Sequence, residues 1–156
     1  MNYELYMRAA LSEAAEAAAA GDPADGAVAV IDEAMVARAR ATVHASGDPT
    51  AHAVINAIRG AARRLGRTSM SGVMVFAAVE PCAMCVGALL QSDADGLVFA
   101  LRDPGSGACG SSLQLAEAPG RSRRLRVVSG ILRDDAAELR PDLDPDRGPS
   151  AALARR

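Results

Sequence analysis

The sequence predicts a single α/β domain in which helices cover both faces of a five-stranded mixed sheet, a three-layer sandwich. Two observations lead to this fold class. Apolar runs of strand length alternate with segments of helical periodicity, and half of the 156 residues are hydrophobic, which is enough for a core of this size. We expect the domain to span residues 1–140. Residues 141–156, rich in Pro and Asp and without apolar periodicity, are expected to form a flexible tail.

Turn residues and periodicity predict the elements in chain order. Apolar residues recur at helical spacing from Tyr3 to Ala20, and Gly21 and Pro23 end this helix. The turn at Asp32 and Glu33 joins two strands into a hairpin. The strands of the hairpin are expected at 26–31 and 35–43, followed by a helix over 51–65, a buried strand over 73–79, a helix that opens at Pro81, strands over 97–101 and 125–128, and a last helix over 131–139.

One histidine and two thiols have the composition and spacing of a zinc site. His52 precedes the sequence Pro81-Cys82-Ala83-Met84-Cys85, and imidazole and thiolate are ligands that zinc prefers. Structural zinc sites have four protein ligands, whereas catalytic sites have three and keep one position for water. We therefore expect one zinc ion per chain, held by His52, Cys82 and Cys85, with its fourth position open.

Five stretches of the chain resemble the cytidine deaminase superfamily, and most closely its bacterial tRNA adenosine deaminases. They are residues 26–30, 47–53, 79–88, 97–111 and 129–132. The resemblance implies the cytidine-deaminase-like three-layer fold, a catalytic zinc ion, and hydrolytic removal of an amino group from a base.

The position of the family's general acid–base residue is occupied by a residue without a proton to transfer. The family motif reads His-x-Glu, and the Glu moves protons between the zinc-activated water and the base. Here that position is Val54. A positioned acid–base group contributes about 10²–10⁴ in rate. His44, on the loop before the His52 helix, is the best substitute nearby, but nothing in the sequence sets its distance from the metal, and an ordinary surface histidine is the simpler interpretation.

The substrate pocket implied by the resemblance also departs from the family pattern. Counting back from His52, the substrate-binding Asn of the family falls at Ala41. Cys109 lies in the glycine-rich turn bordering the pocket and is interpreted as a small buried filler. The resemblance places these further residues at the pocket: Ala53, Val54, Glu80, Arg102 and Asp103.

Charge and aromatic content argue against tRNA binding. The formal net charge is −2, and of the four aromatic residues Tyr3, Tyr6, Phe76 and Phe99, the two phenylalanines lie in predicted strands and are expected in the core, so no stacking platform for bases is apparent. Arg121, Arg123, Arg124 and Arg126 form a local basic cluster, which we interpret as the solvated flank of a strand. A small nucleobase-like ligand remains as the alternative to tRNA.

Three functions are compatible with these residues. The first is a pseudoenzyme, a zinc-binding tRNA adenosine deaminase-like protein without ordinary deaminase activity that acts as a binding or partner subunit. The non-catalytic subunit of eukaryotic tRNA adenosine deamination resembles this chain in carrying Val in place of the Glu. The second is a zinc enzyme with altered chemistry on a small nucleobase-like heterocycle, and the third is a deaminase whose Glu was removed by engineering.

The last expectations concern the oligomeric state of the protein and its location in the cell. We expect a homodimer or a paralogous partner subunit, with the apolar residues Val86, Leu89 and Leu90 after Cys85 as a contact surface. No apolar run reaches the length of a membrane span, and the first residues lack the pattern of a secretory signal, so no membrane association and a cytoplasmic location are expected.

Overall fold

The computed structural model describes residues 1–117 and 124–147, which contain one five-stranded sheet in the order β2-β1-β3-β4-β5. The first two strands pair antiparallel with each other, and β1 also pairs antiparallel with β3. The remaining pairs, β3 with β4 and β4 with β5, are parallel, so the mixed sheet is confirmed. The strands are β1 (Gly26–Ile31), β2 (Ala34–Arg40), β3 (Met74–Val79), β4 (Gly96–Leu101) and β5 (Arg126–Ser129).

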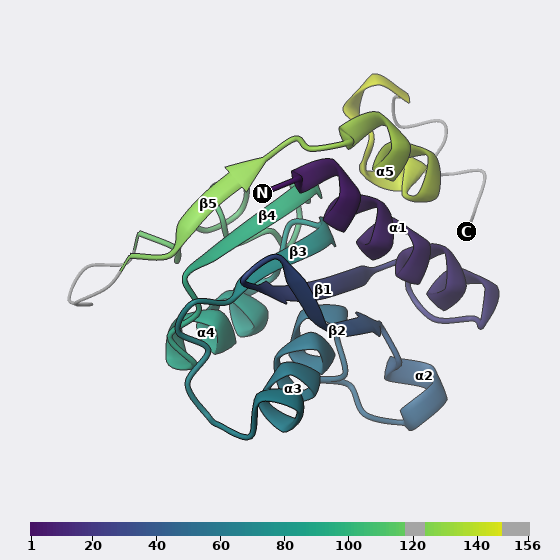
Figure 1. Cartoon of the computed structure of the whole chain (residues 1–156). Coiled ribbons are helices and arrows are strands. Elements are labelled where there is room, and N and C mark those ends of the chain that lie inside the picture. The colour runs from purple at the N-terminus through teal and green to yellow at the C-terminus, as the bar shows by residue number, and fades with distance from the viewer. Residues whose placement is uncertain (118–123, 148–156) are drawn as a thin grey trace.

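Helices cover both faces of this sheet, as Figure 1 shows. One face carries α1 (Tyr3–Ala19) and α5 (Arg133–Leu139), and the other carries α3 (Ala53–Leu65) and α4 (Ala83–Gln91). The short α2 (Val43–Ser46) connects β2 to the segment before α3. The predicted three-layer α/β/α sandwich is confirmed.

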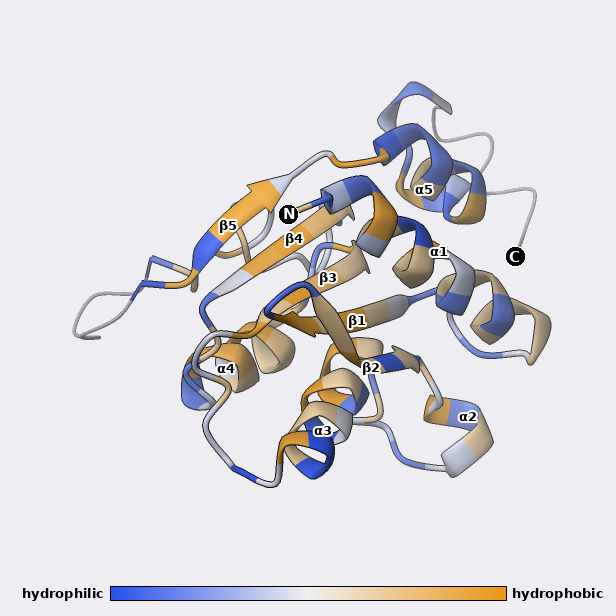
Figure 2. Cartoon of the chain, viewed as in Figure 1, coloured by the Kyte–Doolittle hydropathy of each residue, from blue (hydrophilic) through white to orange (hydrophobic). Residues whose placement is uncertain are grey.

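Alternation along the central strands divides the core into two clusters. In β3, Phe76 faces α1, where its ring centroid lies 5.6 Å from that of Tyr3 and 5.2 Å from that of Tyr6. Its neighbours Val75 and Ala77 face the opposite cluster, formed with α3 and α4. All residues of β3 and β4 are buried, and Figure 2 shows the apolar colouring of these strands. Burial on both faces explains why these strands are continuous apolar runs rather than alternating ones.

The helices that carry the predicted zinc ligands begin later than expected. The α3 helix begins at Ala53, with His52 as its N-cap residue, and α4 begins at Ala83, with Cys82 as its N-cap residue. Both N-cap residues have extended backbones, as N-caps generally do. Strand β2 likewise ends at Arg40 rather than at residue 43, because the chain turns into α2.

The proposed contact surface after Cys85 requires a correction. Val86 and Leu89 are fully buried within the chain, because they pack against the sheet as part of the α3 and α4 core cluster. Leu90 is only partly buried, and Met84 on the same helix is exposed. An interface on α4 would therefore use Met84 and Leu90.

The chain beyond α5 continues in two short 3-10 helices, η1 (Pro141–Leu143) and η2 (Pro145–Arg147). Leu143 packs against the cluster of α1 and α5. Residues 148–156 of the expected tail, and Arg121 and Arg123 of the basic cluster, lie outside the described residues. Across the part that is described, no helix is long and apolar enough to cross a membrane.

Candidate metal centre and its pocket

The three predicted zinc ligands meet at the starts of α3 and α4. Nδ1 of His52 lies 3.5 Å from Sγ of Cys82 and 3.6 Å from Sγ of Cys85. A tetrahedral zinc with Zn–N of about 2.05 Å and Zn–S of about 2.3 Å separates nitrogen and sulfur ligands by about 3.6 Å. The arrangement therefore fits a zinc ion bound through Nδ1 and both sulfurs. Among the described residues, no further Asp, Glu, His or Cys joins this cluster of mutually close ligand atoms.

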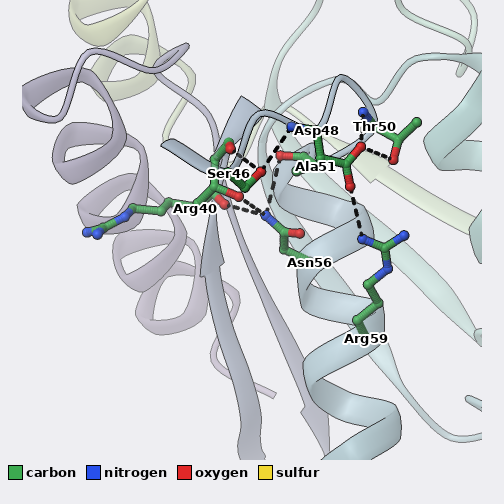
Figure 3. Close-up of polar contacts among 8 residues, drawn as sticks. Arg40, Ser46, Asp48, Thr50, Ala51, Asn56 and Arg59 are labelled. Carbon is green, nitrogen blue, oxygen red and sulfur yellow. Dashed lines mark hydrogen bonds and ion pairs between the residues drawn. The ribbon is translucent and has the colours of Figure 1, made fainter. Parts of the chain in front are cut away.

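A partly buried amide, that of Asn56, links the end of β2 to the start of α3, as Figure 3 shows. Nδ2 of Asn56 donates to the carbonyl oxygen of Arg40 at 2.9 Å, to Oγ1 of Thr42 at 3.0 Å and to the carbonyl oxygen of Ala51 at 3.3 Å. These bonds join the end of β2 to the residue that precedes His52. No sequence pattern predicted this role, although an amide one helical turn after a ligand is a signal that could have indicated it.

The turn before His52 is held by Asp48. Its Oδ1 accepts hydrogen bonds from the backbone N–H of Thr50 at 2.8 Å and from the Thr50 hydroxyl at 2.7 Å, and Arg59 lies 3.7 Å from Oδ2 (Figure 3). The Thr50 hydrogen bonds, chiefly, lower the pKa of Asp48. The side chain therefore holds the turn between α2 and His52.

The two thiols share a hydrogen bond that favours a thiolate. The bond from the Cys85 side chain, aided by His52, lowers the pKa of Cys82 to about 5 despite partial burial. The same bond and burial raise the pKa of Cys85. At neutral pH the pair therefore keeps one proton, which zinc binding releases, so that metal affinity falls as the pH is lowered.

A cavity of about 200 Å³ opens beside the three ligands. Of the predicted pocket residues, Ala41, Val54, Glu80 and Asp103 line it, and Val54 is 2% exposed. Ala53 is buried but is not part of the cavity wall.

Two predicted candidates lie elsewhere. Arg102 is exposed and lines a different cleft of about 390 Å³ between β4 and the C-terminal segment. His44 is exposed on α2, and its neighbour Val43, rather than His44 itself, lines the zinc pocket.

Glu80 has a buried carboxylate that holds the loop over the pocket. It accepts hydrogen bonds from the backbone N–H groups of Asp103 at 3.3 Å, Cys109 at 3.0 Å and Ser111 at 3.2 Å, and from the Ser111 hydroxyl. A Cβ at Gly107 would lie 2.3 Å from the Glu80 carboxyl carbon, so the loop requires glycine there. The Glu80 carboxylate is thus fully used in organising this loop.

Cys109 lies under the same loop and is 6% exposed. Burial, with the nearby Glu80 charge, raises the pKa of Cys109 to about 12. Its side chain is therefore a neutral thiol at physiological pH, as expected of a small buried filler.

Two charged residues of the pocket had no predicted role. Asp25, just before β1, and Arg140, at the end of α5, both line the cavity. Burial raises the pKa of Asp25 from 3.8 to about 6, and the charge of Arg140 partly opposes this effect. The one available signal was the position of Asp25 directly before a wholly apolar strand, because acidic residues at such junctions can point into a site.

Comparisons with known proteins agree with this geometry. Residues 1–101 match the family described as the cytidine and deoxycytidylate deaminase zinc-binding region. The tRNA-specific adenosine deaminase of Bacillus subtilis (strain 168) is 34% identical over 136 residues, which cover 87% of this chain and 84% of that protein. The guanine deaminase of the same strain is 37% identical over 101 residues, covering 64% of this chain and 65% of that enzyme.

A solved structure gives the same result at the level of the fold. It comes from biochemical and structural studies of A-to-I editing by tRNA:A34 deaminases, and it superposes with a TM-score of 0.83 at 32% identity. The superposition covers 86% of this chain and 97% of that chain. On its fold, its ligand geometry and these similarities, the chain belongs to the cytidine and deoxycytidylate deaminase family of zinc-binding proteins.

Proposed function

We propose that this chain is a zinc-binding, tRNA adenosine deaminase-like protein that does not catalyse ordinary hydrolytic deamination. It binds a small nucleobase-like heterocycle in the zinc pocket, as a homodimer or with a paralogous partner subunit. The observation that carries this proposal is Val54, which lines the same cavity as the three metal ligands.

Val54 leaves the chemistry without its proton carrier. Zinc, when bound, supplies a Lewis acid that activates water. Deamination also needs one proton for the ring nitrogen and another for the departing ammonia, and an aliphatic side chain provides neither. Ala41, also in the cavity wall, has no amide with which to hold a base.

Neither Glu80 nor His44 compensates for this loss. Glu80 is bonded to the loop above the pocket, and His44 is exposed outside the cavity. Similarity to the adenosine and guanine deaminases supports a base as the kind of ligand. The cavity of about 200 Å³ is smaller than the ~300–1,000 Å³ of typical ligand pockets, which supports a single heterocycle rather than a nucleotide.

A second candidate function is a zinc enzyme with altered chemistry on such a heterocycle. It is favoured by the ligand set, because three protein ligands are typical of catalytic zinc and four of structural zinc. In this case the substrate itself, or a residue outside the family motif, would handle the protons.

Deaminase assays on the zinc-loaded protein test the proposal. We expect no ammonia release from an adenosine-containing tRNA anticodon stem-loop, adenine, guanine or cytosine. Val54→Glu alone should restore little, because Ala41 cannot orient the base, whereas Val54→Glu with Ala41→Asn should recover more of the about 10²–10⁴ that an acid–base group contributes. Val54→Gln is the control that matches the size of Glu without its proton transfer.

Two results would contradict the proposal. Robust deamination by the unmodified protein would exclude the non-deaminating function outright. A strong gain from Val54→Glu alone would show that the pocket still orients a deaminase substrate without the Asn.

A further inference from the structure

We propose that the Asp25 carboxylate is the hydrogen-bond acceptor by which the zinc pocket selects its ligand, a small heterocycle that places an amino group against Oδ1. This inference rests on the proposed function, because it assumes that the pocket takes a small heterocycle.

Asp25 lies partly buried in the wall of the cavity, and one of its two carboxylate oxygens lacks a partner. Its backbone is held in place, since its carbonyl oxygen accepts from the N–H of Ala41 at 3.0 Å and its N–H donates to the carbonyl oxygen of Pro23 at 2.7 Å. Its Oδ1, however, is buried and has no hydrogen-bond partner among the described residues. Nearly all buried polar atoms in native proteins have a partner, so an exception inside a pocket indicates a group that arrives with a ligand.

The other buried acids of the chain behave differently. Asp22 accepts from the backbone N–H groups of His44 at 2.6 Å and Ala45 at 3.1 Å, and so caps α2. Glu80 accepts from several donors of the loop above the pocket. In the described part of the chain, Oδ1 of Asp25 is the one buried side-chain oxygen or nitrogen without a partner.

Neither the nearby cation nor the metal ligands account for this oxygen. Arg140 lines the same cavity, but its Nε and Nη2 bond to the two carboxylate oxygens of Asp142 at 3.0 and 2.9 Å. The ion pairs found among the described residues do not join it to Asp25. Asp25 is also outside the cluster of metal-ligand atoms that lie within 4.8 Å of one another, so it does not close the zinc shell.

The chemistry of a carboxylate then defines the ligand edge. An ionised carboxylate only accepts hydrogen bonds, so the ligand must donate an N–H or O–H group to it. Amino-substituted heterocycles have an exocyclic NH2 donor, which purine and pyrimidin-2-one lack although each keeps one ring N–H. A hydrogen bond to a charged group in a desolvated site changes Kd by about 10- to 100-fold.

Calorimetric titration of the zinc-loaded protein with matched rings tests the inference. The probes are adenine and 2-aminopurine against purine, and cytosine against pyrimidin-2-one. We expect at least one amino-bearing ring to bind about 10- to 100-fold more tightly than its unsubstituted partner. Asp25→Asn, which replaces an acceptor oxygen with an NH2 donor, should abolish this preference and leave the zinc content unchanged. Asp135→Asn, an exposed acid outside the cavity, should keep the preference.

The outcomes separate this inference from the proposed function. If the unmodified protein binds rings with and without the amino group equally well, or if Asp25→Asn keeps the preference, the role of Asp25 is wrong and the heterocycle pocket stands. If Asp25→Asn loses zinc, Asp25 is a metal ligand and the inference is wrong. If none of the rings binds to the unmodified protein, the proposed function itself fails, and the inference with it.

Discussion

The polar side chains of the pocket are of two kinds: some lie close enough together to bind one metal ion, and one has an oxygen without a hydrogen-bond partner. His52, Cys82 and Cys85 lie at mutual distances that suit one tetrahedral ion, so a metal satisfies all three. Asp25 has a buried oxygen without a partner. The first arrangement predicts a cofactor and the second predicts a ligand.

Removal of one zinc ligand should release the metal. We expect about one zinc per unmodified chain and a large loss of zinc in Cys85→Ala, because two remaining ligands cannot hold the ion against dialysis. Elemental analysis of protein purified without chelator gives the stoichiometry. Cys109→Ala is the matched control, since this buried thiol is outside the ligand cluster. Full zinc retention in Cys85→Ala, or no stoichiometric metal in the unmodified protein, would contradict the assignment.

The raised pKa of Asp25 should make stability depend on pH. Because its pKa is about 6 in the folded protein and 3.8 in the unfolded chain, the folded state binds more protons between these values. The unfolding free energy therefore falls as the pH rises through this window. The total loss reaches about 3 kcal/mol by pH 7 and stays constant above it. Asp25→Asn should be more stable than the unmodified protein by about that amount at pH 8, and most of this advantage should disappear by pH 4.

Denaturant unfolding of both proteins across pH 4–8 measures this difference. Both proteins are measured free of zinc, with a chelator present, so that metal binding does not contribute and the comparison isolates Asp25. A stability difference that stays constant over this range would show that the carboxyl titrates normally.

At the scale of elements, the end of β3 and the loop over residues 103–111 contribute to one wall of the pocket. Glu80, immediately after β3, is bonded to this loop through the backbone N–H groups of Asp103, Cys109 and Ser111. The N–H of Glu80 in turn donates to the carbonyl oxygen of Leu101 at 2.8 Å, at the end of β4. The wall therefore depends on a buried carboxylate rather than on apolar contact alone.

Truncation of Glu80 should weaken this wall. Glu80→Ala leaves the buried N–H of Cys109 without an acceptor, at about 1–3 kcal/mol, and exposes the part-buried N–H groups of Asp103 and Ser111 to water at a smaller cost, so we expect a total loss of about 2–4 kcal/mol in the unfolding free energy. Glu80→Gln keeps one acceptor oxygen and should lose less. Chemical denaturation at pH 7 gives the free energies, and hydrogen exchange at Cys109 and Ser111 reports on the loop. Unchanged exchange at these amides in Glu80→Ala would contradict the role of the carboxylate.

For the whole molecule, one partly exposed apolar surface lies on α4, the helix that carries Cys85. Helices α3 and α4 bury their apolar residues against the sheet, yet Met84 is 36% exposed and Leu90 is only partly buried. Exposed apolar residues beside a site are a common feature of subunit contacts. Association through α4 would place two zinc pockets near one interface.

We predict that at least two chains associate through this surface. Light scattering at tens of micromolar should give at least twice the chain mass, if the affinity is about micromolar or tighter. Met84→Lys should weaken the association, because it places a charge on the apolar surface. Leu5→Lys, an equally simple change at an exposed residue of α1 on the opposite face of the sheet, should not. A monomer at this concentration would contradict the prediction.

Local signals in the sequence were sufficient for the fold and the metal ligands. The wholly apolar runs over 73–79 and 97–101 predicted strands that are covered on both faces, because a strand with one face in water alternates apolar and polar residues. The spacing of His52, Cys82 and Cys85 predicted the metal centre, because zinc requires those donors and the chain offers few others. Both kinds of signal lie within short segments, where periodicity and residue type determine the structure.

Only the tertiary structure decided the remaining composition of the pocket. Asp25 and Arg140 are far apart in the sequence, and they meet because β1 lies beside β3 in the sheet and the chain after β5 returns through α5 to the pocket. The same packing leaves Arg102 and His44 outside. Whether a buried carboxylate oxygen is bonded, as in Glu80, or lacks a partner, as Oδ1 of Asp25 does, depends on donors from distant segments, and residue type alone does not predict those donors.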